Sequence, residues 1–260
     1  MTQVLVTRPL QDAATWILAL KHAGLEAVEF PLLQVNATLT SKEAPAVLQR
    51  LQQSQAVMFV SANAVRFLAE ALKHQAGWVE HFTSQARVWC TGPGTAAALL
   101  KVGIPASQID QPAVTAAQLD SEALWAQVQK QATLGFQVLF IRGTDETGAI
   151  AGRDWLVQQL EHKGASAQAI AAYQRVPTPL TALLQAQVQQ HVARGAVWLF
   201  SSSACLQSLV DQCHGQDWST AKAVVTHPRI AALAQQLGWP RPSIAAPGLD
   251  SMLASIKSLA

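Results

Sequence analysis

The sequence predicts an α/β fold with parallel sheets, divided into two domains. Three observations support this: short aliphatic or β-branched runs alternate with helical patterns, a motif recurs about 140 residues along the chain, and two stretches interrupt the alternation. Strands that alternate with helices are the signature of βαβ units and parallel sheets. At 260 residues the chain also has the length at which one core begins to split into two domains.

The apolar runs give the expected strands in chain order. They are residues 4–7, 27–30, 57–60, 87–90, 138–141, 167–171, 197–200, 223–226 and 243–245. Helical patterns fill the gaps, among them residues 13–22, 63–72, 95–101, 153–163, 204–212 and 230–237.

The repeat sits at two kinds of strand-to-helix turn. Residues 57–64 correspond to residues 197–204, and Thr91-Gly92-Pro93 corresponds to Thr226-His227-Pro228. Self-similarity at a fixed offset indicates repeated architecture. The chain therefore looks duplicated, and its halves should share one α/β topology.

Residues 31–44 and 173–181 break the alternation, and we place linkers at about residues 31–38 and 172–178. These linkers lie about 140 residues apart. Both chain ends, residues 1–35 and 177–260, are therefore expected to form one domain. Residues 38–172 are expected to form the other.

Composition narrows the class of protein. No apolar stretch reaches the roughly 18 residues of a membrane span, and the chain starts directly in a strand-like run without a charged leader or cleavage site, so we expect a cytoplasmic protein that does not cross a membrane. The net charge of +2 and the lack of a basic run argue against nucleic-acid binding. Cys90, Cys205 and Cys213 have neither CxxC nor disulfide-framework spacing, which suits buried thiols in a reducing compartment.

The repeated turns are the first candidate binding sites. Where a strand ends and a helix begins, unpaired N–H groups and the helix dipole favour an anion. The polar residues at one pair of turns are Ser61, Asn63, Ser201 and Ser203. Each is also a good helix cap, and capping alone is the simpler interpretation of any one of them. Four turns in duplicated positions favour ligand binding at one sheet edge in each half.

Residues 92–97 read as G-x-G-x-x-A, with Asp110 eighteen residues beyond the first glycine, so a dinucleotide site is an alternative. Pro93 removes an N–H that a pyrophosphate would use, Asp110 ends only a weak strand, and the matching turn of the second half lacks both glycines. We therefore do not favour nucleotide binding.

Arg8 and Arg142 end equivalent strands, and Arg153 opens the next helix. The planar guanidinium suits a carboxylate because it can bond both oxygens, although surface ion pairs remain an alternative. Tyr173 is the single tyrosine of the chain and lies at a linker, where its hydroxyl either faces a cleft or packs. The histidines show no metal-ligand pattern, and no Ser-His-Asp spacing indicates a triad, so metal and acyl-transfer chemistry are not expected.

A set of motifs extends over nearly the whole chain. They are Val4-Leu5-Val6-Thr7-Arg8-Pro9, Phe59-Val60-Ser61-Ala62-Asn63-Ala64-Val65, Gly92-Pro93-Gly94-Thr95-Ala96, Ile141-Arg142-Gly143 followed by Gly152-Arg153, Ala172-Tyr173-Gln174-Arg175, and Phe200-Ser201-Ser202-Ser203. Each motif is weak alone, but their order and spacing are specific. In this set the chain resembles the uroporphyrinogen-III synthase (HemD) family.

The resemblance implies two HemD-type, flavodoxin-like domains joined by a two-stranded linker, as an interleaved duplication with the first domain built from both chain ends. It implies a cyclising hydro-lyase that binds hydroxymethylbilane in the cleft between the domains and uses no cofactor. Tyr173 takes the position of the family's tyrosine. Gly92, Thr95 and Gly143 join the substrate-binding residues, and His227 or Arg229 is expected to replace the hydroxyl contact that Ile230 does not provide.

The implied reaction makes little demand on a nucleophilic side chain of the protein. The pyrrole nitrogen drives loss of water from the hydroxymethyl group to give an azafulvene, and attack by ring D gives a spiro intermediate whose fragmentation and reclosure invert that ring. The protein would orient the substrate, with Tyr173 as a proton donor. We expect a monomer in transient contact with the preceding enzyme of the pathway. The alternative is a two-domain protein that binds a small anion without chemistry.

Overall fold

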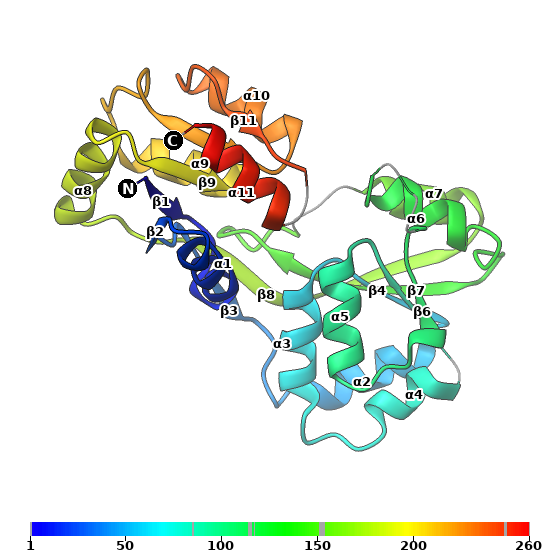
Figure 1. Cartoon of the computed structure of the whole chain (residues 1–260). Helices are drawn as coiled ribbons and strands as arrows, with labels where there is room; N and C mark the ends of the chain where they lie inside the picture. The colour runs from blue at the N-terminus through cyan, green and yellow to red at the C-terminus, as the bar shows by residue number, and fades with distance from the viewer. Residues whose placement is uncertain are drawn as a thin grey trace. The chain divides into compact units, whose positions relative to one another are not determined.

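The structure is a computed structural model that describes residues 2–84, 86–113, 116, 118–150, 154–246 and 249–259. The chain divides into two compact units (Figure 1). Unit 1 comprises Met1–Val35 and Val176–Ala260, and unit 2 comprises Asn36–Arg175. The chain passes from one unit to the other within two strands, β3 (Leu33–Ala37) and β8 (Ser166–Pro177).

Unit 1 is built on a five-stranded sheet in the order β11-β10-β9-β1-β2. Its strands are β1 (Gln3–Val6), β2 (Glu26–Glu29), β9 (Val197–Phe200), β10 (Lys222–Val225) and β11 (Ser243–Ile244), and every pair runs parallel. Its helices are α1 (Leu10–His22), α8 (Ala182–Ala193), α9 (Ser203–Gln212), α10 (Pro228–Gln236) and α11 (Leu249–Ser258). One core packs α8, α9 and α10 on one face of the sheet, and a second core packs α1 and α11 on the other.

Unit 2 contains a six-stranded sheet in the order β3-β8-β7-β4-β5-β6. Its other strands are β4 (Ala56–Phe59), β5 (Arg87–Cys90), β6 (Ile109–Asp110) and β7 (Gln137–Thr144). Helices α2 (Ala44–Gln53), α3 (Ala62–Leu72), α4 (Trp78–Ser84) and α5 (Pro93–Lys101) lie on one side of this sheet, with α6 (Ser121–Val128) and α7 (Trp155–His162) on the other (Figure 1). Ala106–Gln108 forms a short 3₁₀ turn before β6.

The two sheets have the same strand order if the strands of unit 1 are numbered from β9 to β11 and then from β1 to β2. Starting there, β11-β10-β9-β1-β2 becomes 3-2-1-4-5, and β6-β5-β4-β7-β8 of unit 2 is also 3-2-1-4-5. Counted from the N-terminus, unit 1 has the order 2-1-3-4-5 of flavodoxin-like sheets. The predicted α/β class with parallel sheets is confirmed. An interleaved duplication would produce these two orders, but it stays a prediction.

Each stretch expected to interrupt the alternation contains a strand, because β3 lies within residues 31–44 and β8 continues to Pro177. The chain changes unit within these two strands, in keeping with the two-stranded linker that the resemblance implies. Leu33 and Val35 are buried while Gln34 and Asn36 are exposed, which is the period-two pattern of a strand. Thr38 N–H donates to Ala172 O at 3.2 Å, and Thr178 N–H donates to Leu32 O at 2.9 Å. These bonds show that β3 runs antiparallel to β8.

Three tryptophans gather in the core of unit 1. The rings of Trp218 and Trp239 stack with centroids 4.9 Å apart, and Trp198 meets both edge-on. Edge-to-face and offset rings pack well in a core. This cluster forms part of the core beneath α9 and α10.

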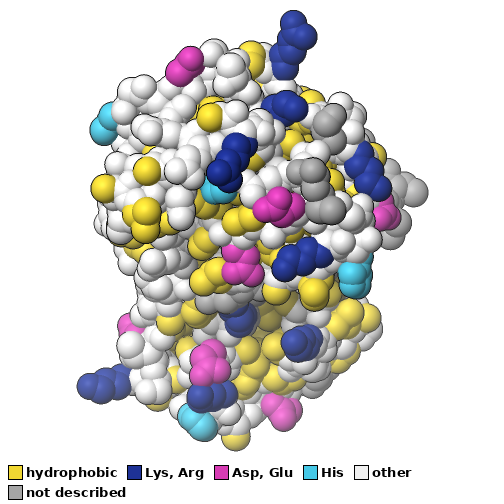
Figure 2. Space-filling model, turned by 60° about the vertical axis from the view of Figure 1, so that its left-hand side comes forward, with side chains coloured by type: hydrophobic (Ala, Val, Ile, Leu, Met, Phe, Trp, Pro, Cys, Tyr) yellow, Lys and Arg dark blue, Asp and Glu magenta, His cyan; other side chains and the backbone are white. Residues whose placement is uncertain are grey.

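Charged side chains are dispersed over the face that Figure 2 shows. On the face shown in Figure 2, the Lys and Arg side chains are separated by acidic and uncharged groups, in keeping with the net charge of +2. None of the helices in the described part of the chain has the length and apolarity needed to cross a bilayer.

Candidate functional site

The predicted turns lie at the carboxyl ends of the central strands of each sheet. Strand order reverses between β4 and β7 in unit 2 and between β9 and β1 in unit 1. Open α/β sheets bind ligands outside the strand ends at such a reversal. Ser61 follows β4 and Arg142-Gly143 lie at the end of β7, while Ser201 follows β9 and Arg8 follows β1. The structure therefore places Ser61 and Arg142-Gly143 at the strand reversal of unit 2, and Ser201 and Arg8 at the strand reversal of unit 1.

Tyr173 lies within β8, close to the point where the chain passes from unit 2 to unit 1, and its side chain has no exposed surface. Its hydroxyl is 2.9 Å from Ser61 Oγ, and Arg175 Nη2 donates to it at 2.8 Å. The Tyr173 ring stacks on Phe67 of α3 at 5.7 Å between centroids, and the Arg175 guanidinium lies 5.3 Å from the ring centroid. The ring and the hydroxyl are thus both fixed by neighbours from β8 and α3.

Gly143 makes room for that ring. The register between β7 and β8 shifts at this point, because Arg142 pairs with Ala171 but Gly143 pairs with Tyr173. A Cβ on residue 143 would lie 2.5 Å from Tyr173 Cζ and closer still to Cε2. A bulge that turns a side chain toward a site is a recurring feature near active centres. Glycine is required here by the close approach of the aromatic ring.

Arg142 is buried, with 5% of its surface exposed. Its Nη1 lies 3.2 Å from Asp154 Oδ1, and its guanidinium lies 4.6 Å from the centroid of the Phe140 ring. Its Nε is buried and has no hydrogen-bond partner. The ion pair considered from the sequence exists, but the arginine is not a surface residue.

A cavity of about 230 Å³ opens at the same end of the sheet in unit 2. Its polar lining consists of Thr91, Ser121, Arg142, Tyr173 and Arg175. Met58, Phe140 and Leu156 contribute apolar walls. Polar and apolar groups contribute about equally to the lining, so this cavity is more polar than most small-molecule sites.

The turn before α5 also borders this region. Gly92 is the N-cap of α5, and Thr95 occupies its third helical position with 7% of its surface exposed. Asn63 lies in the first turn of α3, after the N-cap Ser61, whose Oγ accepts from Ala64 N–H at 3.2 Å. Both helices therefore begin beside the carboxyl edge of the sheet.

In unit 1, Arg8 Nε donates to Ser201 Oγ at 3.0 Å, and the Arg8 guanidinium lies 4.6 Å from the centroid of the Trp16 ring. Ser202 caps α9 by accepting from Ala204 N–H, so neither Ser201 nor Ser203 is the cap. When residues 57–64 are aligned with residues 197–204, α9 starts one residue later than α3, so the cap moves from the position of Ser61 to Ser202. Ser203 Oγ is buried without a hydrogen-bond partner.

His227 caps α10, where its Nδ1 accepts from Arg229 N–H at 3.0 Å. The side chains of His227 and Arg229 are exposed. Ile230 takes the third helical position, which Thr95 holds in α5, and it is buried. The imidazole thus replaces the usual capping oxygen at this turn.

Arg153 lies outside the described residues, so its predicted role is not placed. The helix expected from residue 153 begins at Trp155, with Asp154 as its N-cap.

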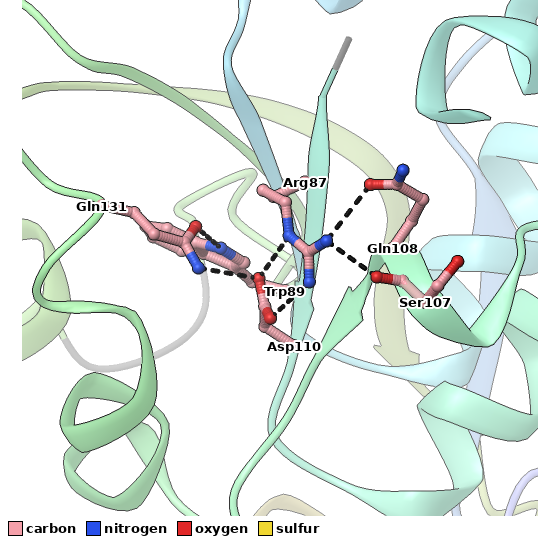
Figure 3. A network of polar contacts seen from close by, with 6 residues as sticks. All are labelled: Arg87, Trp89, Ser107, Gln108, Asp110 and Gln131. Atoms are coloured by element: carbon pink, nitrogen blue, oxygen red, sulfur yellow. Dashed lines mark hydrogen bonds and ion pairs between the residues drawn. The ribbon is translucent and has the colours of Figure 1, made fainter. Parts of the chain in front are cut away.

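Asp110 is engaged in an ion pair, which removes the support for a dinucleotide site. Arg87 Nε and Nη2 donate to the two Asp110 carboxylate oxygens at 2.9 and 2.6 Å (Figure 3). Gln131 Nε2 also donates to Asp110, and Gln131 Oε1 accepts from Trp89 Nε1. The carboxylate therefore holds the short strand β6 to its neighbours.

Sequence reasoning missed Arg175, Phe67, Thr91 and Ser121. Arg175 had a readable signal, because residues two apart on a strand point to the same face and Arg175 follows Tyr173 by two. The stacking of Phe67 requires the packing of α3 on β8, which no local pattern reveals. Within the described residues, no three His, Cys, Asp or Glu side chains gather as metal ligands.

Comparison with known proteins shows which family the chain belongs to. Residues 14–254 match the sequence family described as uroporphyrinogen-III synthase HemD. The chain belongs to the uroporphyrinogen-III synthase family.

Two relatives carry the name of this family. The uroporphyrinogen-III synthase of Salmonella typhimurium is 27% identical over 246 residues, which cover 91% of this chain and 92% of that protein. The uroporphyrinogen-III synthase of Chlorobaculum parvum is 27% identical over 180 residues, which cover 69% of this chain and 66% of that protein.

Solved structures of the family share the fold. A mutant uroporphyrinogen III synthase from the extremely thermophilic bacterium Thermus thermophilus is similar with a TM-score of 0.63 and 15% identity, over 100% of this chain and 98% of that one. The uroporphyrinogen-III synthetase of Helicobacter pylori is similar with a TM-score of 0.64 and 16% identity, over the whole of both chains. At such identity the likeness concerns the fold alone.

Proposed function

We propose that this protein is a cyclising hydro-lyase that closes hydroxymethylbilane into uroporphyrinogen III with inversion of ring D. The observation that carries the proposal is the family match over residues 14–254. The relatives from Salmonella typhimurium and Chlorobaculum parvum are both named uroporphyrinogen-III synthase. Family membership does not favour the alternative of a non-catalytic anion-binding protein.

The reaction begins when the C–O bond of the hydroxymethyl group breaks. The oxygen leaves as water after it takes a proton, the pyrrole nitrogen supplies the electron pair, and loss of its N–H proton gives a neutral azafulvene. Attack by the substituted carbon of ring D forms a spiro intermediate, which fragments and recloses with that ring inverted. Orientation of the two reacting ends is the main contribution asked of the protein.

Tyr173 is the proposed source of the proton. Arg175 donates a hydrogen bond to the phenolic oxygen, so its charge stabilises the oxygen as the proton leaves. Ser61 Oγ is within hydrogen-bond distance of the same hydroxyl and is partly exposed, whereas Tyr173 is not. We propose that this pair donates the proton. Tyr173 is its source, and the Ser61 hydroxyl is the hydrogen-bonded neighbour of Tyr173.

The carboxylates of the substrate are the proposed partners of the remaining predicted residues. These are Arg8, Ser61, Asn63, Gly92, Thr95, Arg142, Gly143, Arg153, Ser201, Ser203, His227 and Arg229. Support comes from the helix N-termini beside the strand ends in each unit, since N–H groups and the dipole favour anions there.

The proposal includes a cytoplasmic monomer that uses no cofactor. The odd number of cysteines without disulfide-framework spacing supports a reducing compartment. A transient contact with the enzyme that makes the substrate is part of the proposal, because free hydroxymethylbilane also closes without inversion.

The test is the identity of the product. The purified protein is mixed with fresh hydroxymethylbilane, the products are oxidised to porphyrins after a short incubation, and the isomers are separated by chromatography. We expect the type III isomer in excess over the type I isomer of the protein-free control. If the protein leaves both the rate and the type I product unchanged, it lacks the activity and the anion-binding alternative gains support.

A further inference from the structure

The buried guanidinium of Arg142 has an unmet hydrogen-bonding group. Its Nε has no partner, and the one carboxylate paired with its Nη1, from Asp154, belongs to a side chain that is 71% exposed. A buried donor without a partner is costly, more so when it belongs to a charged group. Such a group is expected to have an acceptor when the protein is at work.

The surroundings of Arg142 indicate that this acceptor is an anion. Arg175 provides a second guanidinium in the lining of the 230 Å³ cavity, and Thr91 and Ser121 provide hydroxyl groups. Thr91 directly precedes the N-cap of α5, and Ser121 is the first residue of α6. The nearby carboxylate of Asp120 accepts from Ala123 N–H as the cap of α6. That carboxylate already satisfies the N-terminus of α6, whereas α5 has no side-chain cap. The two cations and the N-terminus of α5 together favour a negative ligand.

The size of the cavity limits what part of a ligand enters it. Sites that enclose drug-sized molecules have volumes of about 300–1,000 Å³. A cavity of about 230 Å³ is below that range, so it fits a substituent and not a whole tetrapyrrole. The apolar walls formed by Met58, Phe140 and Leu156 suit the methylene groups of such a substituent.

We propose that this cavity is a subsite for one acetate or propionate arm of the substrate, with the carboxylate bound by Arg142 through Nε. This inference rests on the proposed function for the identity of the arm, but the carboxylate chemistry stands on the cavity itself. Nε and Nη2 lie on one edge of the guanidinium, which matches the two oxygens of a carboxylate.

The subsite also connects binding with the proposed proton donor. Arg175 lines the cavity and donates to the hydroxyl of Tyr173. Gly143, between Arg142 and the Tyr173 ring, lines it as well. An arm held by Arg142 therefore fixes its pyrrole ring relative to Tyr173.

The first test uses sodium propionate as the probe and the Nε–Hε NMR signal of Arg142 as the readout. In full-length protein labelled with ¹⁵N-arginine, we expect a saturable shift of this signal at millimolar propionate. Propionamide and sodium chloride at equal ionic strength should not produce it. The signal is assigned by its loss in Arg142→Met. If propionate shifts it no more than propionamide does, the subsite proposal is wrong.

The second test measures turnover. Arg142→Met should raise KM by about 10- to 100-fold, as expected for loss of a charge-assisted pair, with the type III product retained. Arg50→Met is the matched control, because Arg50 bonds Gln168 and Ala169 in the same unit and does not line the cavity. Its KM should stay at the parent value. An unchanged KM in Arg142→Met would overturn the proposal.

The two proposals can fail separately. If the parent protein makes no type III isomer but its Arg142 signal responds to propionate, the proposed function fails and the carboxylate subsite stands. If the parent makes the type III isomer but propionate leaves the signal unmoved, the subsite fails and the function stands. Should Arg142→Met not fold, Arg142→Lys replaces it, and a KM equal to that of the parent would again count against Arg142.

Discussion

Tyr173 combines complete burial with a hydroxyl contacted by Ser61 and Arg175. We predict that Tyr173→Phe folds like the parent, because the ring and its stacking on Phe67 are retained. Turnover should fall by about 10²- to 10⁴-fold, the usual contribution of proton transfer. The measurement is single-turnover formation of the type III isomer, with a thermal melt to confirm folding. A loss below about tenfold would show that this hydroxyl is not the main acid.

Gly143, which leaves room for the Tyr173 ring, gives a second prediction. Gly143→Ala should lower the free energy of unfolding by about 1–3 kcal/mol, because the new Cβ forces the buried Tyr173 ring to move. Turnover should fall as well if the hydroxyl must stay beside Ser61. Gly94→Ala is the matched control, since a Cβ there meets nothing within 4 Å. Equal stability of the two variants in urea would contradict the steric argument.

The thiol of Cys90 gives a prediction for pH dependence. Burial raises its pKa to about 11, although a hydrogen bond from Gly92 N–H acts in the opposite direction. In the unfolded chain a thiol titrates at about 8.5, so the unfolded state loses its proton first and stability falls as pH rises from about 8.5 to about 11. Cys90→Ala should remove up to about 1.4 kcal/mol of this fall per pH unit. Urea unfolding of the parent and of Cys90→Ala at pH 8 and pH 10.5 measures this fall. If the free energy of unfolding falls equally in both proteins, Cys90 is not its cause.

The position of a site residue was predictable from sequence where the residue type and its place after a strand together indicate its role. An arginine at a strand end and a serine at a strand-to-helix turn placed Arg142 and Ser61 correctly at the sheet edge. The burial of Arg142 and the stacking of Phe67 on Tyr173 were not predictable, because they depend on which helix covers which strand. Ser202 was missed as a cap because three serines in a row leave the helix start undetermined by one residue.

Among the elements, β6 is a two-residue strand held by the network around Asp110. Asp110→Asn should lower the free energy of unfolding by about 1–3 kcal/mol, since it leaves the Arg87 guanidinium without its counter-charge. Turnover should not change, because the network lies outside the proposed site. Glu70→Gln breaks an exposed pair with Lys73 and should leave the free energy of unfolding close to that of the parent. Loss of activity in a folded Asp110→Asn protein would revive a ligand role for this carboxylate.

The elements themselves were largely readable from the sequence. All nine expected strands are present, because hydrophobic runs between helical patterns are a strong signal. Their ends differ from the expected ones by at most one residue, except at the C-terminal ends of β7 and β8. β3 was missed since Pro31 precedes it and only Leu33 and Val35 face the core. β8 was expected to stop before Tyr173, but its backbone continues beside β3 to Pro177. A pairing partner more than 130 residues away has no local signature.

For the whole molecule, the repeat and the compact units divide the chain differently. The repeat matches residues 57–64 with residues 197–204, so a repeat spans about 140 residues from the N-terminus. The compact units instead place β1 and β2 beside β9 and β10. Sequence analysis alone allowed both divisions, because a repeat records similarity and not which copies of a strand pair with each other.

Independent folding of the middle segment distinguishes the two divisions. We predict that the fragment of residues 38–172 folds alone with a cooperative transition, because β4 to β7 and the start of β8 pair within it and their covering helices are included. A fragment that ends near residue 130 should aggregate. It retains β4 without β7 and β1 without β9, which leaves apolar strand edges unpaired in both units. Size-exclusion chromatography and thermal melts of the two fragments measure this. If the repeat-length fragment is the soluble one with a cooperative melt, each half of the chain is its own domain and β1 can fold without β9.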